Sequence, residues 1–156
     1  MKIELKNVKY AAFASEETSC YSASLYVNGK KIGEVSNEGH GGPDAFYGDR
    51  AAYKAADEWC RANLPKWSMH DDDDKHDTDL EMHCGTLLTN SLLLRDYKRD
   101  CRTKVLFTKP NEKGIWSVKH KGDVQATIER LLAQRPDLTI INGKSDEEVL
   151  ETLRQL

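Results

Sequence analysis

The stretch that decides the fold reads YSASLYVNGKKIGEVS and spans residues 21–36. In its first half apolar and polar residues alternate, which is the pattern of a half-buried β-strand. The next two residues, Asn28 and Gly29, favour a two-residue hairpin turn because both of its central positions need positive φ. The stretch therefore predicts a β-hairpin whose second strand covers residues 30–36. The alternating apolar residues of the first strand are Tyr21, Ala23, Leu25 and Val27.

The segments on both sides of this hairpin extend it into a small sheet with a helix. Residues 2–13 predict a first strand with a bulge near Asn7, where the apolar positions change parity. Residues 37–44, NEGHGGPD, hold three glycines and a proline and predict a shaped loop. Residues 45–64 carry apolar side chains at helical spacing up to Pro65, so a helix is expected to cover one face of the sheet.

The second half of the chain predicts a further set of helices and strands. A long helix over 78–99 begins with Thr78-x-x-Glu81, the pattern of a capping box. Two short strands at 104–108 and 114–119 predict a hairpin, and Pro110 lies in the turn between them. After the hairpin come a helix capped by Asp123, a short strand at 138–141 and a helix capped by Ser145 with Glu148.

These elements predict an α+β fold in two halves. Residues 1–65 form an N-terminal antiparallel sheet packed on a helix, and residues 66–77 form an acidic linker. Residues 78–156 form a C-terminal α+β subdomain with a long helix, a hairpin and a C-terminal helix. A chain of 156 residues with 38% hydrophobic and 31% charged residues lies outside the composition typical of disorder.

Composition also bears on where the protein acts. No apolar run reaches the roughly 18 residues that a membrane-spanning helix requires, and the first residues lack the apolar core of a signal peptide. We therefore expect a protein of the host cytoplasm with no membrane association. The cysteines form no C-x-x-C pair, which suits reduced thiols in that compartment. They are Cys20, Cys60, Cys84 and Cys101.

Charge is strongly separated along the chain, although the formal net charge is only −3. Residues 71–81 hold seven acids and one lysine, whereas residues 95–121 hold nine basic and three acidic residues. Cations mixed with aromatic side chains are typical of surfaces that bind phosphates and stack on bases. An acidic run can instead bind a basic site on a partner protein. The predicted partner-binding residues are Asp71, Asp72, Asp73, Asp74, Lys98, Arg99, Arg102, Lys104, Trp116 and Lys119.

The loop at 37–44 offers the main candidate for chemistry. Glycines on both sides of His40 leave its imidazole exposed, and Asp44 could orient it or share a metal with it. The alternative is that the glycines only shape a tight connection. A metal cluster is also conceivable from His70, His76, His83 and Cys84 with the carboxylates of residues 71–74 nearby, but the spacing matches no closed zinc site. The sequence contains no phosphate loop and no nucleophile elbow, so we assign no catalytic residue, metal or cofactor.

Three segments carry a resemblance to known proteins: residues 15–18 (SEET), 21–30 (YSASLYVNGK) and 33–42 (GEVSNEGHGG). Over about residues 1–65 the chain resembles small uncharacterised proteins encoded by phages and plasmids. The resemblance implies an accessory protein of a mobile element and carries over no activity and no catalytic residue. The second half resembles no family in this way.

Together these observations lead to a hypothesis of binding rather than catalysis. The leading expectation is an inhibitor of a host defence machine, of the anti-CRISPR type, that occupies a host protein or ribonucleoprotein complex. Two alternatives stay open. One is a metal- or histidine-dependent hydrolase or nuclease centred on His40, and the other is a nucleic-acid-binding module that uses the basic surface of residues 95–121.

Overall fold

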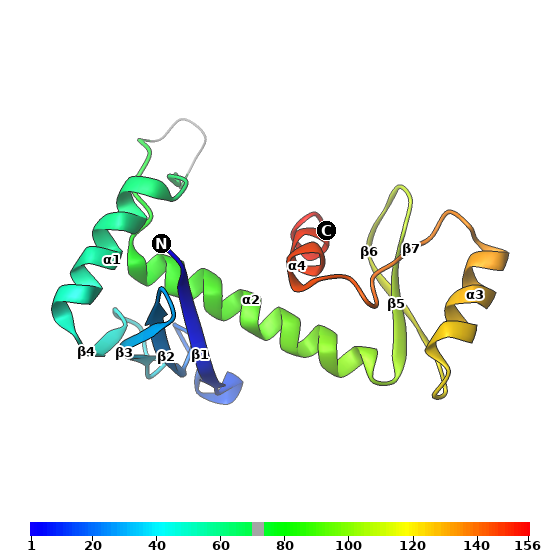
Figure 1. Cartoon of the computed structure of the whole chain (residues 1–156), viewed down its shortest axis with the longest axis horizontal. Coiled ribbons are helices and arrows are strands. Elements are labelled where there is room, and N and C mark those ends of the chain that lie inside the picture. Colours follow the sequence, from blue (N-terminus) through cyan, green and yellow to red (C-terminus); the bar gives the residue numbers. More distant parts are fainter. Residues whose placement is uncertain (70–73) are drawn as a thin grey trace. The chain divides into compact units, whose positions relative to one another are not determined.

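The computed structural model of the chain describes residues 1–69 and 74–156 and shows an α+β fold, as predicted (Figure 1). The chain divides into two compact units, residues 1–89 and residues 90–156. Helix α2 (Leu80–Cys101) contributes its first turns to the first unit and its remaining turns to the second. Among the described residues, no helix combines the length and apolar character needed to cross a membrane.

The first unit is built on a four-stranded antiparallel sheet in the order β1-β2-β3-β4. Its strands are β1 (Ile3–Tyr10), β2 (Tyr21–Val27), β3 (Lys30–Asn37) and β4 (Ala45–Gly48), with a short 3-10 helix, η1 (Ala12–Ala14), after β1.

Two local predictions for this sheet are confirmed. Asn7 has a φ of 54°, and the β1–β2 register shifts between Lys6 and Lys9, so the predicted bulge is present. Asn28 and Gly29 have φ values of 49° and 81°, as the predicted hairpin turn requires.

The predicted helix over 45–64 is wrong in its first residues. Residues 45–48 form β4, and helix α1 covers Arg50–Asn63. Phe46 lies opposite Val35 of β3, and its ring stacks on that of Tyr53 with a centroid distance of 4.5 Å. A strand forms here because Phe46 gains a partner on both elements, whereas Asp49 caps the helix by accepting the Ala52 N–H at 3.0 Å.

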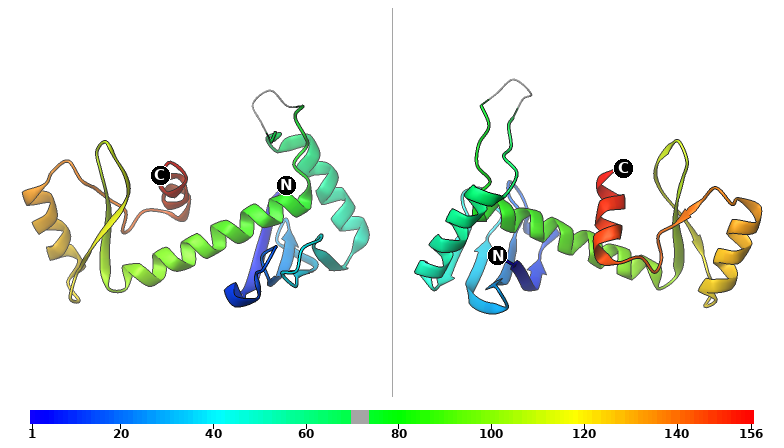
Figure 2. Two further views of the ribbon diagram at one scale, coloured as in Figure 1. Left: turned by 180° about the vertical axis from the view of Figure 1, so that it is seen from behind. Right: turned by 45° about the horizontal axis from the view of Figure 1, so that its top comes forward.

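The core of the first unit extends beyond the predicted boundary at residue 65. Leu80, Cys84 and Leu88 of α2 are buried together with Ala56 and Cys60 of α1 and the inner face of the sheet. Figures 1 and 2 show α1 and the first turns of α2 beside the sheet. The described residues of the segment predicted as a linker, 66–69 and 74–77, therefore belong to the first unit.

The start of α2 differs from the predicted capping box at Thr78. The Thr78 hydroxyl donates to the Pro65 carbonyl, while Asp79 accepts the Met82 N–H at 2.8 Å. Asp79 therefore caps the helix, and Glu81 is free to accept the Asp44 N–H at 2.8 Å. The pattern failed because tertiary partners were available for both predicted capping residues.

The second unit surrounds the hairpin of β5 (Lys104–Lys109) and β6 (Glu112–Lys119) in a three-stranded sheet of order β6-β5-β7. Helix α3 (Val124–Gln134), strand β7 (Thr139–Ile140) and helix α4 (Asp146–Arg154) complete the unit. Leu106, Ile141 and Val149 form a buried cluster against Tyr97 of α2 and Leu153 of α4, whereas α3 packs on β5.

The predicted caps in the second unit are confirmed. Asp123 accepts the Ala126 N–H at 2.9 Å at the start of α3. Ser145 and Glu148 form the reciprocal capping box of α4.

Candidate functional site

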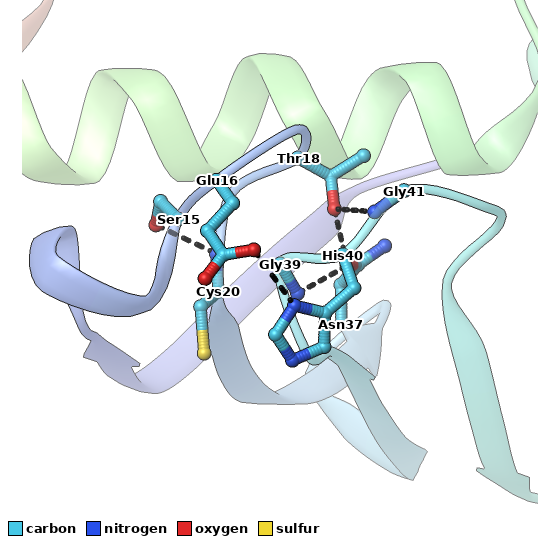
Figure 3. Close-up of polar contacts among 8 residues, drawn as sticks. All are labelled: Ser15, Glu16, Thr18, Cys20, Asn37, Gly39, His40 and Gly41. Carbon is cyan, nitrogen blue, oxygen red and sulfur yellow. Dashed lines mark hydrogen bonds and ion pairs between the residues drawn. The ribbon is translucent and has the colours of Figure 1, made fainter.

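The glycine-rich loop of the first unit docks onto the turn that precedes β2. The carbonyl oxygen of Gly39 accepts the N–H groups of Glu16 at 3.0 Å, Glu17 at 2.9 Å and Thr18 at 3.4 Å. Three amides that converge on one oxygen fix both segments in space. The SEET and GHGG stretches are therefore two halves of one structural unit (Figure 3). We call this unit, residues 15–18 and 37–44, the glycine loop.

Gly39 is required at its position by a close approach of two backbones. Its φ is +88°, and a Cβ there would lie 2.0 Å from the carbonyl oxygen of Ala14 and 3.0 Å from the Cβ of Cys20. Both the left-handed conformation and the contact exclude a side chain. This glycine therefore serves the fold of the loop, which connects β3 to β4 and not a strand to a helix.

Side chains close the loop from within. Thr18 donates its hydroxyl to the Asn37 side-chain oxygen at 2.6 Å and accepts the Gly41 N–H at 3.3 Å. The same Asn37 oxygen accepts the Gly39 N–H at 2.9 Å, and the Asn37 amide donates to Asp44 at 3.0 Å. These polar groups bond one another, which leaves few of them to bind a ligand.

Asp44 is bonded to Tyr21 rather than to His40. The Tyr21 hydroxyl donates to Asp44 Oδ2, and Asn37 donates to Asp44 Oδ1. Burial and then the hydrogen bond to Asp44 raise the pKa of Tyr21 above its ordinary range. Asp44 therefore stabilises the loop against the sheet, and the predicted partnership between Asp44 and His40 is not formed.

His40 lies on the outside of the loop. Its side chain is 64% exposed, and its closest acidic partner is Glu16, with Nδ1 3.4 Å from Oε2. His40, Lys9 and Cys20 line one shallow hollow of about 440 Å³. Within residues 1–69 and 74–156 no three His, Cys, Asp or Glu side chains are placed to hold a metal ion.

The cysteines are free thiols throughout the described chain. Burial raises the pKa of Cys84 to about 12 and that of Cys60 to about 11, so both thiols are protonated and inert at neutral pH. Burial also lowers the pKa of His83. His70, the remaining member of the conceivable metal cluster besides His76, lies outside the described residues.

The structure describes four of the seven acids of the acidic run: Asp74, Asp77, Asp79 and Glu81. Asp71, Asp72 and Asp73 lie outside the described residues, and Asp74 is exposed. The segment is closed at its base by an antiparallel bridge between Trp67 and His76, with N–O distances of 3.0 and 2.8 Å.

Three of the predicted cations are paired with acids of their own unit. Lys98 contacts Asp146 at 2.8 Å, Arg99 contacts Asp96 at 2.9 Å, and Lys104 contacts Asp100 at 3.5 Å. Exposed pairs of this kind contribute little to stability, about 0 to 1 kcal/mol each. In the part of the chain that the structure describes, Arg102 and Lys119 join no ion pair.

Backbone hydrogen bonds gather several cations at one end of the second unit. His120 donates its N–H to the Thr103 carbonyl at 3.1 Å, and its ring bonds the Cys101 carbonyl at 3.2 Å and the Gly122 N–H at 3.0 Å. Lys104 and Lys119 lie opposite each other in the ladder. The end of α2, the base of the hairpin and the start of α3 therefore meet here.

We call this surface the basic end: Arg102, Lys104, Lys119, Lys121 and Arg130. Sequence reasoning counted Lys121 in the basic stretch but singled out neither it nor Arg130. The signal for Arg130 is its position seven residues after the helix cap Asp123, which returns it to the same helix face.

Trp116 is not part of the basic end. It pairs with Phe107, whereas Lys119 pairs with Lys104, and positions three residues apart on a strand point to opposite faces. Lys109 Nζ lies 4.4 Å from the centroid of its ring. The structure thus separates Trp116 from the cations of the basic end, although Lys109 of the same basic stretch lies over its ring.

No family model matches the chain, and no curated protein or solved structure matches it either. Function must therefore be inferred from the structure itself. This α+β protein has a loop whose polar groups hydrogen-bond one another in its first unit and a basic end in its second unit.

Proposed function

We propose that the protein acts by binding nucleic acid through the basic end of its second unit. The observation that carries this proposal is the gathering of five exposed or half-buried cations at the place where α2, the hairpin and α3 meet. The acids beside them are Asp100, which contacts Lys104, and Asp123, which caps α3. Positive charge is thus left over at this surface.

Phosphates are the natural partners of such a surface. Each Lys or Arg that neutralises a phosphate releases a condensed counterion, so the affinity falls as salt rises. Four of the five side chains are exposed to solvent, and Lys104 is half-buried. Contacts of this kind position a nucleic acid without reading its sequence.

The biological setting that we propose rests on the expectation, from the sequence of residues 1–65 alone, of an accessory protein encoded by a phage or plasmid. A host defence machine of the CRISPR type exposes guide and target nucleic acid. A protein that covers these phosphates would inhibit the machine without any catalysis. In this proposal the first unit serves as the scaffold and the second unit contacts the nucleic acid.

The direct test is fluorescence anisotropy with single- and double-stranded oligonucleotides at 50, 100 and 200 mM salt. The test variant combines Arg102→Gln, Lys104→Gln and Lys119→Gln. If each cation contacts one phosphate, the affinity of the variant should fall about 10- to 100-fold at 50 mM salt, and its salt slope should decrease by about 2 for single strands and about 3 for duplexes.

The matched control combines Arg50→Gln, Lys30→Gln and Lys54→Gln, which removes the same charges from exposed positions of the first unit. The control should lose less than about threefold in affinity because only the long-range attraction changes. Absence of binding by the natural chain at 50 mM salt would overturn the proposal. An equal loss in the control variant would show that net charge, not the basic end, is responsible.

The proposed setting has a cellular test. Phage plating is compared on a host with an RNA-guided defence system that expresses either the natural chain or the triple variant of the basic end. The natural chain should raise plating, and the variant should not. If both proteins raised phage plating equally, inhibition of the defence system would not depend on the basic end, and this part of the proposal would be overturned.

A further inference from the structure

A hollow of about 260 Å³ lies within the basic end, at the start of α3. Lys119, Lys121 and Arg130 line it together with Asp123, and His120 and Thr127 form part of its wall. Its volume lies just below the roughly 300 to 1,000 Å³ of typical small-molecule sites, so it suits a chemical group smaller than a whole cofactor.

Hydrogen bonds hold the wall of the hollow in place. His120 is only 8% exposed, its Nδ1 accepts the Gly122 N–H at 3.0 Å, and its Nε2 lies 3.2 Å from the Cys101 carbonyl oxygen. Thr127 is 4% exposed and donates its hydroxyl to the Asp123 carbonyl at 2.8 Å. With these groups already bonded, the charged side chains at the rim are the ones left for a ligand.

The backbone around His120 turns sharply. Lys121 and Gly122 have φ values of 50° and 91°, two consecutive left-handed residues. A lysine in this conformation is uncommon and is usually held by the surrounding structure. The turn places Lys121 beside the same hollow as Lys119 and Arg130.

The charge of the lining selects the kind of anion. Lys119, Lys121 and Arg130 supply three positive charges, and within the described residues none of them joins an ion pair. Asp123 supplies one negative charge and already accepts the Ala126 N–H. A phosphomonoester carries about −1.5 to −2 at pH 7, which matches the remaining charge better than the single charge of a backbone diester.

We propose that this hollow binds a phosphomonoester, which the proposed function would supply as the terminal phosphate of a nucleic-acid strand. The inference rests on that function for the source of the phosphate, but not for the chemistry of the hollow. Arg130 is suited to grip two phosphate oxygens at once because its guanidinium is a planar fork of donors.

The test compares oligonucleotides of one sequence that end in a 5′-phosphate, a 3′-phosphate or hydroxyl groups only, measured by anisotropy with the full chain. One phosphorylated end should bind about 5- to 20-fold more tightly than the hydroxyl ends, as expected for one added charge-assisted contact. Arg130→Gln should remove this preference. Lys113→Gln, an exposed cation of the same hairpin outside the hollow, should keep it.

A second measurement identifies the source of the phosphate. Inorganic phosphate is titrated into the isotope-labelled full chain, and the titration is followed by NMR. The backbone amide signals of Lys121 and Gly122 should change in chemical shift in the natural chain and not in Arg130→Gln. Thermal unfolding should be the same for both proteins because Arg130 is exposed.

The outcomes separate this inference from the proposed function. One outcome is that oligonucleotides bind equally with and without end phosphates and that inorganic phosphate shifts no amide signal. This outcome would overturn phosphomonoester binding by the hollow and leave the proposed nucleic-acid binding unaffected. Amide shifts without any oligonucleotide binding would support the phosphomonoester site and overturn nucleic acid as its source. Loss of the preference in Lys113→Gln as well would overturn the assignment to the hollow.

Discussion

The glycine loop of the first unit and the basic end of the second unit contrast in how their polar groups are used. In the glycine loop, Thr18, Asn37, Asp44 and Tyr21 bond one another and the backbone. In the basic end, Arg102 and Lys119 join no ion pair among the described residues. The distinctive sequence of the glycine loop therefore serves to fix the loop's own conformation. The lysines and arginines of the basic end, which match no sequence motif, leave positive charge available for a partner.

The largest expected effect tests whether the glycine loop is structural. Gly39→Ala should lower the free energy of unfolding of the first unit by about 3 kcal/mol or more, because the left-handed backbone and the contact with Ala14 both resist a Cβ. Hydrogen exchange of the β2 and β3 amides measures this loss in the unit concerned.

The matched control for this change is Gly42→Ala. Gly42 also has a positive φ, +84°, but a Cβ there meets no atom within 4 Å. Its cost should be about 1 kcal/mol, the backbone contribution alone. Equal losses in the two variants would show that the close approach at Gly39 contributes nothing.

A second prediction uses pH to test how firmly the interior of the first unit is closed. The folded pKa of Cys84, about 12, lies above the unfolded value of 9.0, so above pH 9 the unfolded chain loses this proton first. The fall in the free energy of unfolding from this group should approach about 1.4 kcal/mol per pH unit above pH 9, and it should total about 1.6 kcal/mol between pH 9 and 10.5.

Cys84→Ala isolates this contribution. The variant should show a shallower decline in stability above pH 9, although Cys60 and Tyr21 still contribute to it. The measurement is urea unfolding at several pH values under reducing conditions. An unchanged slope would mean that the thiol is exposed to solvent in the folded protein.

A third and smaller effect concerns the bond between Tyr21 and Asp44. Tyr21→Phe should cost about 1.5 kcal/mol, because a half-buried carboxylate loses a hydrogen-bond donor. Tyr47→Phe is the control, since that side chain is 72% exposed and should change stability by less than about 0.5 kcal/mol. The measurement is urea unfolding of both variants. If Tyr21→Phe lost no more stability than Tyr47→Phe, the bond between Tyr21 and Asp44 would not stabilise the glycine loop.

Local signals in the sequence predicted much of the fold. The bulge at Asn7, the turn at Asn28-Gly29 and the capping box at Ser145 all depend on neighbouring residues, and all three are present. The strand at 45–48 was missed because its reason is distant: Phe46 pairs with Val35 and stacks on Tyr53. The capping box at Thr78 failed for the same kind of reason.

The candidate sites follow the same rule. Sequence reasoning found the cations Arg102, Lys104 and Lys119, but it grouped Trp116 with them although strand alternation puts it on the other face. It joined Asp44 to His40 because they are close in sequence, whereas the Asp44 carboxylate accepts a hydrogen bond from Tyr21, which lies in β2. The helical spacing from Asp123 to Arg130 is visible in the sequence, but the packing of α3 on the hairpin is needed to place Arg130 beside Lys119.

The smallest expected effect concerns His40, the residue that the alternative function requires. His40→Ala should change the free energy of unfolding by less than about 0.5 kcal/mol, because its exposed ring has only the 3.4 Å contact with Glu16. Oligonucleotide affinity should stay within about twofold of the natural chain, since His40 belongs to the other unit. A large loss of binding or of phage protection, with stability unchanged, would move the functional site to the glycine loop. The self-bonded residues around His40 would then be the frame that presents it.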